Sequence, residues 1–143
     1  GAPVHMMANC WGLAINGFCR QVVANGQILV HSPPNLKRDF VPISVLCVAV
    51  SSILNSDNVE SSIINVASSK AKNLQEIVSL ICARAELVLD ITPEVIFKSR
   101  TDTAGKNYNL SISNNKLSKI ININSNLEGE VDHLLMKCKE WFG

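Results

Sequence analysis

The sequence predicts a mixed α/β fold, with helices and strands following one another in a single domain over residues 1–143. In several stretches the apolar residues recur at three- and four-residue spacing, which is typical of amphipathic helices. Short β-branched runs stand between them and are typical of strands. Of the 143 residues, 47% are apolar, and a domain of this size buries roughly two-thirds of its unfolded surface. A folded core is therefore expected, and intrinsic disorder is excluded.

Residues with known capping preferences mark the ends of the expected helices. Asn9 is a suitable N-cap for the first helix, and Gly26 ends it because glycine tolerates positive φ. Ser44 is expected to cap the second helix. Asn73 caps the third, with Glu76 three residues later in the arrangement of a capping box. The four expected helices cover 9–24, 44–54, 73 to about 85–89, and 127–142.

Short segments between the helices are expected to be strands. Short runs rich in β-branched residues are typical of strands. Pro33 and Pro34 follow the first of these runs, and proline cannot donate a hydrogen bond to a ladder. A helix of one or two turns is expected to begin at Ser113. The expected strands cover 27–31, 40–43, 62–67, 93–98 and 108–110.

Charge and hydropathy limit the partners of the chain. Thirteen Lys and Arg residues face twelve Asp and Glu, for a formal net charge of +1. This lacks the basic excess of a protein that binds nucleic acid by neutralising phosphates, so no nucleic-acid partner is expected. No apolar run approaches the roughly 20 residues that a membrane span needs, and the first residues do not resemble a secretory signal. A soluble, cytoplasmic protein without a membrane partner is expected.

Cysteine and histidine spacing argues against a metal site. The five cysteines are an odd number, and no two of them form a CxxC pair. Structural zinc sites and thioredoxin-like motifs both depend on that spacing. His5, His31 and His133 are far apart and form no HExxH pair. We therefore expect reduced, structural thiols and no metal ligands.

The motifs of self-contained enzymes are missing from the sequence. No glycine-rich loop for a nucleotide or dinucleotide follows a strand, and there is no GxxxxGK[ST] motif. No GxSxG elbow or Cys/His nucleophile set is present. The only tyrosine, Tyr108, is followed four residues later by Ile112 rather than Lys. We therefore predict no catalytic residue in this chain.

One segment resembles a known family. The stretch from Lys37 to Ser44 resembles the RDF/Y-hydrophobic-x-V/I-S/D motif of the extended short-chain dehydrogenase/reductases, which include nucleotide-sugar epimerases, dehydratases and reductases. Further segments resemble the family's motifs in the same order, over nearly the whole chain but only the family's C-terminal half. These segments are 1–4, 19–21, 27–31, 64–69, 73–77, 97–108, 113–117 and 127–142.

The resemblance implies that this chain is the substrate-binding portion of such an enzyme and lacks most of the Rossmann sheet. The Rossmann half, with its glycine loop and Tyr-x-x-x-Lys, would lie upstream or on another subunit. The complete enzyme, an oxidoreductase or isomerase, would bind NAD or NADP, and this chain alone would bind neither. The alternative is a non-catalytic α/β interaction domain derived from the family. Departures from the family's motifs at Val45, Ala67 and Ser69 favour this interaction domain. Because Ala67 and Ser69 stand where the family commonly has glycine, the turn after 62–67 is expected to avoid positive φ.

The resemblance also assigns binding roles to six residues. Arginine suits a nucleotide-sugar diphosphate because its planar fork pairs with two phosphate oxygens at once. The family's two arginines match Arg38 and Arg100, and its base-holding segment matches Asn9, Trp11 and Leu13. Pro3 matches the proline beside the nicotinamide.

Five of these assignments have a structural alternative that the sequence leaves open. Arg38 and Arg100 could be solvated charges, because exposed ion pairs are common and weak. Asn9 could be a helix cap, Trp11 a core or interface aromatic, and Pro3 a plain loop proline. The helix over 9–24 and the aromatic end of the chain would leave apolar surface bare without an N-terminal half. A homo-oligomer is therefore one expected state.

Overall fold

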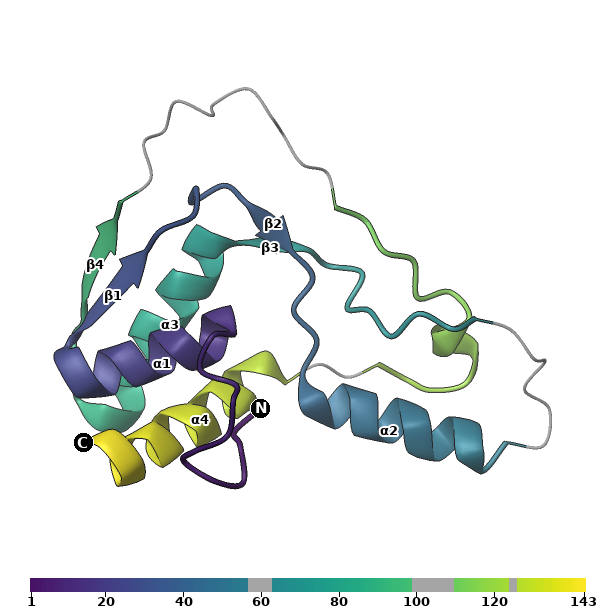
Figure 1. Ribbon diagram of the computed structural model, residues 1–143. Coiled ribbons are helices and arrows are strands. Elements are labelled where there is room, and N and C mark those ends of the chain that lie inside the picture. Colours follow the sequence, from purple (N-terminus) through teal and green to yellow (C-terminus); the bar gives the residue numbers. More distant parts are fainter. Residues whose placement is uncertain (57–62, 99–109, 124–125) are drawn as a thin grey trace.

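Three helices and a pair of parallel strands make up the larger part of the fold (Figure 1). The computed structural model describes residues 1–56, 63–98, 110–123 and 126–143. The elements are α1 (Ala14–Asn25), β1 (Gln27–Val30), β2 (Lys37–Arg38), α2 (Ile43–Leu54), β3 (Lys72–Asn73), α3 (Leu74–Leu89), β4 (Glu94–Phe97), the 3₁₀ turn η2 (Leu117–Lys119) and α4 (Leu127–Phe142). The expected mixed α/β class is confirmed.

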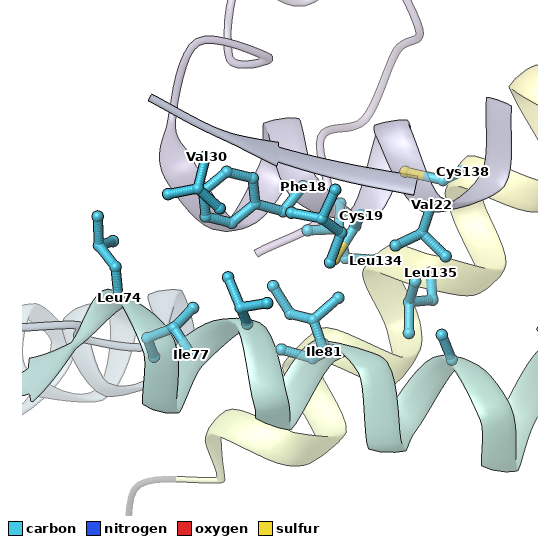
Figure 2. Close-up of a cluster of buried hydrophobic side chains, with 14 residues drawn as sticks. Phe18, Cys19, Val22, Val30, Leu74, Ile77, Ile81, Leu134, Leu135 and Cys138 are labelled. Atoms are coloured by element: carbon cyan, nitrogen blue, oxygen red, sulfur yellow. The ribbon is translucent and has the colours of Figure 1, made fainter. Parts of the chain in front are cut away.

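The main core lies between α1, α3, α4 and β1 (Figure 2). Residues at three- and four-residue spacing on each helix supply it, as the sequence patterns predicted. Burying one such aliphatic side chain stabilises the fold by about 1.5–3 kcal/mol. Fully or almost fully buried members include Cys19, Val22, Ile28, Ile77, Ile81, Leu134, Leu135 and Cys138.

β1 and β4 form a parallel pair, in register from Gln27 opposite Glu94 to Val30 opposite Phe97. Gly26 joins α1 directly to β1, and its φ of 63° lies in the left-handed region that glycine adopts without strain. The expected strands over 27–31 and 93–98 and the end of the first helix are thus confirmed.

A second, antiparallel pair brings the start of α3 beside the segment after β1. In this ladder Lys37 lies opposite Asn73, and Arg38 lies opposite Lys72. The Asn73 side chain accepts a hydrogen bond from the Glu76 N–H at 2.8 Å, while the Glu76 carboxylate accepts one from the Asn73 N–H. The predicted capping box of α3 is confirmed.

α2 lies apart from the three-helix core (Figure 1) and packs on a small second cluster. Ala49, Leu117 and Ile121 are the buried members of this cluster. The prediction that Ser44 caps α2 is wrong, because Pro42 holds the N-cap position and makes no side-chain cap hydrogen bond. The free N–H of Ser44 instead donates to the Glu130 carboxylate of α4 at 3.0 Å.

Two expected strands do not form. Residues 40–43 lead into α2, and 63–67 have no ladder partner among the described residues. Strands need a neighbour as well as β-branched side chains. Ser69 has a φ of 57°, so the expectation that this turn avoids positive φ is wrong. The short helix expected from Ser113 forms only as the 3₁₀ turn η2, which begins at Leu117. Of the strand expected over 108–110, all but Leu110 lies outside the described residues.

No helix in the described part of the chain is both long enough and apolar enough to cross a bilayer.

Candidate functional site

The carboxyl end of β1 brings three of the predicted site residues together. Trp11, Leu13 and Arg38 all line a pocket of about 300 Å³, together with Val30 and His31 at the end of β1. Ligands of α/β folds bind at the carboxyl ends of parallel strands, because loops from several elements meet there. The location of this pocket therefore suits a ligand site.

Arg38 is exposed and has no carboxylate partner within salt-bridge distance among the described residues. Its guanidinium donates one hydrogen bond, to the backbone carbonyl of Lys37 at 3.2 Å. The neighbouring Asp39 is engaged elsewhere: both its oxygens accept from the Ser68 N–H at 3.1 Å, and it also accepts from the Ser68 hydroxyl. The charge of Arg38 is thus available to an anion.

Trp11 is held by the carboxyl-terminal end of α4. Its ring meets Phe142 edge-on at 5.1 Å between centroids and Trp141 at 6.3 Å. Its Nε1 donates to the Met6 carbonyl at 2.9 Å, and the Arg20 guanidinium lies 5.8 Å from the ring centroid. Trp11 therefore packs against the main core while it also lines the pocket.

Of the predicted site residues that the structure describes, Asn9 and Pro3 do not line this pocket. Asn9 is exposed, and its expected role as a helix cap is wrong: α1 begins at Ala14, with Leu13 at the N-cap position. Turns over 8–13 delay the helix and let the Trp11 ring reach α4. Pro3 is partly buried in the amino-terminal segment. Arg100 lies outside the described residues.

A larger cleft, which sequence reasoning missed, opens between α3, η2 and the start of α4. Its volume is about 1210 Å³. Lysines from two segments that are distant in the sequence line it. Because of this separation, the sequence alone does not reveal that the lysines lie around one cleft. Among the described residues, the charged members of its lining are Lys70, Lys72, Lys119 and Glu128.

The buried thiols are unsuited to nucleophilic chemistry. Burial raises the pKa of Cys138 to about 12, and burial also raises that of Cys19. Both side chains stay protonated near neutral pH and pack as small hydrophobes. Within the described part of the chain, no three His, Cys, Asp or Glu side chains gather closely enough to hold a metal ion.

The fold is similar to part of two longer α/β proteins of known structure. RMD from Pseudomonas aeruginosa, solved with NADPH, matches 91% of this chain with a TM-score of 0.73 and 14% identity. A candidate epimerase from Burkholderia cenocepacia J2315 matches 94% of it with a TM-score of 0.70 and 15% identity. The resemblance drawn from the sequence is confirmed at the level of the fold.

The match covers 43% of each of these two longer chains, so this chain spans less than half of their length. No family model matches the sequence. No curated protein matches it either.

Proposed function

We propose that this chain is the substrate-binding part of an NAD(P)-dependent nucleotide-sugar epimerase, dehydratase or reductase, and that it is not catalytic on its own. The observation that carries this proposal is the pocket at the carboxyl end of β1, where Arg38 and Trp11 lie together. A guanidinium can pair with two phosphate oxygens at once, and an indole offers an apolar face to a base.

The residues of the pocket divide naturally between the parts of such a ligand. Arg38, helped by Arg100, would hold the diphosphate. Trp11 and Leu13 would contact the base or the sugar. We assign no contact to Asn9 or Pro3, because neither lines the pocket.

The described residues do not fit a dinucleotide cofactor by themselves. The turn after β1 reads His31-Ser32-Pro33-Pro34 and lacks the glycines that let a backbone approach a pyrophosphate. We therefore derive no hydride transfer from this chain. In the complete enzyme, NAD or NADP and the catalytic tyrosine would come from a Rossmann half or another subunit.

The surface of α2 supports the need for such a partner. The helix carries no charged residue, and Val48, Val50 and Leu54 are 51%, 48% and 79% exposed. A helix that is apolar on all sides is normally buried. Because the chain spans only 43% of its structural neighbours, we infer that the rest of the same fold covers this surface.

Calorimetric titration with UDP-, GDP- and dTDP-sugars tests the proposed function. We expect saturable binding of at least one of them, and at least tenfold weaker binding by Arg38→Ala because a charge-assisted contact is lost. Lys37→Ala is the matched control, since Lys37 lies on the same strand but does not line the pocket. Equal losses in both variants would contradict the proposal, as would NAD reduction by the chain alone.

The second candidate is a non-catalytic α/β interaction domain. The exposed apolar surface of α2 favours it, because such a surface usually marks a protein interface. A folded chain that binds none of the three nucleotide sugars would support this reading over the first.

A further inference from the structure

We propose that the larger cleft, between α3, η2 and the start of α4, binds a phosphorylated small molecule with two or more negative charges. This site is separate from the Arg38 pocket and goes beyond the proposed function. Its volume of about 1210 Å³ exceeds the roughly 300–1,000 Å³ of ordinary ligand pockets, so the ligand occupies part of it.

Positive charges outnumber negative ones among the described residues that line the cleft. Lys70 and Lys72 precede α3, and Lys119 comes from η2, nearly fifty residues later in the chain. All three are exposed, and none forms a salt bridge within the described part of the chain. Among the described residues of the lining, Glu128 is the one acidic side chain. Ammonium groups gathered in a concave surface raise the local concentration of anions.

The ladder between β2 and β3 gives an independent reason for an anion. Arg38 and Lys72 lie directly opposite each other, so their side chains emerge on the same face of the pair. Like charges directly opposite are destabilising in an antiparallel ladder. An anion beside Lys72 reduces this repulsion in the unaltered chain. In an Arg38→Ala variant the repulsion is absent, and the lysines of the cleft alone attract the anion.

The uncharged lining suits the organic part of the ligand. Phe40, Leu80 and Ile121 provide apolar surface next to the lysines. The Asn114 amide donates to the Ala67 carbonyl at 3.1 Å and so ties the two segments that bear the lysines. The cleft therefore combines fixed walls, apolar contact area and excess positive charge.

Inorganic pyrophosphate is the probe for this site, titrated by calorimetry at low ionic strength. The full chain carries Arg38→Ala throughout, which removes the proposed nucleotide-sugar contact. In this background we expect saturable binding that weakens as salt is added. Adding Lys72→Gln or Lys119→Gln should weaken it at least tenfold, since each removes a charged contact.

Lys37→Gln in the same background is the matched control, because Lys37 lies on the same ladder but does not line the cleft. Its binding should be unchanged, and circular dichroism should show every variant folded. Absence of saturable binding, or equal weakening by Lys37→Gln, overturns the proposal. Silence toward nucleotide sugars in the unaltered chain, together with saturable pyrophosphate binding, would overturn the proposed function alone.

Discussion

The Glu130 carboxylate of α4 accepts a hydrogen bond from the Ser44 N–H of α2 at 3.0 Å, across 86 residues of sequence. Pro42, at the N-cap, has no side chain that could accept this bond. A side chain from a different helix thus replaces the missing cap. The contact also connects α2, whose Ala49 packs on the small second cluster, to α4 of the main core.

Replacing Glu130 should loosen α2 in a pH-dependent way. Burial acts to raise the pKa of Glu130, but hydrogen bonds from Ser44 and the charge of the amino terminus outweigh it, so the pKa lies below its ordinary value. The stabilisation is therefore present above the ordinary carboxyl pKa and is lost as the pH falls through the lowered one. Glu130→Ala should cost about 1 kcal/mol at neutral pH, the usual effect of losing a cap.

Urea unfolding of the Glu130→Ala chain and the unaltered chain measures this difference at several pH values. Glu128→Ala is the control, since Glu128 lies in the same first turn of α4 and is exposed. A loss that persists undiminished in strong acid would contradict the assignment to the ionised carboxylate.

Asp90→Gly should stabilise the protein. Asp90 ends α3 with a φ of 57°, a conformation that costs a non-glycine residue roughly 1–2 kcal/mol. Its negative charge also lies at the unfavourable end of the helix dipole. We expect a gain of about 0.5–1 kcal/mol in the free energy of unfolding, measured with urea. Asp90→Ala, which keeps a Cβ, should not show the same gain.

The cysteines should differ sharply in reactivity. Cys47 is exposed on α2, whereas Cys19 and Cys138 are fully buried, and burial raises the pKa of both buried thiols. Alkylation of the native chain at about pH 8, followed by mass spectrometry, should modify Cys47 long before the other two. Early modification of Cys138 would show that α4 is not packed as described.

Substitutions on α2 should reduce self-association. Leu54 is 79% exposed on an uncharged helix, and Leu87 on α3 is 68% exposed. If copies of the chain associate through α2, Leu54→Lys should lower the mass that light scattering measures at high concentration. Leu87→Lys should leave it unchanged. An unaltered chain that stays monomeric over a wide concentration range would contradict this prediction.

Most of the structural features that the sequence predicted correctly depend on residues close together in the chain. The α3 capping box involves residues three apart, and Gly26 ends α1 through its own backbone, so neither depends on distant parts of the chain. The last helix shows the same agreement between expected and observed bounds. Each of these features is visible in a short window of sequence.

Features that depend on distant partners could not be predicted in the same way. The segment over 63–67 has strand-like residues but no neighbouring strand among those described. Asn9 has the right chemistry for a cap, yet the contact of Trp11 with α4 moves the helix start to Ala14. In the larger cleft, Lys72 and Lys119 belong to segments that only the fold brings together.

The direct joint at Gly26 has a mechanical consequence for the small pocket. α1 and β1 leave this residue in opposite chain directions, and the pocket lies at their far ends, between Leu13 on one arm and Val30 on the other. A helix of twelve residues is about 18 Å long, so a slight rotation at the joint becomes a sizeable displacement at its tip. Gly26 thus joins the two elements that form opposite walls of a cavity that it does not itself line.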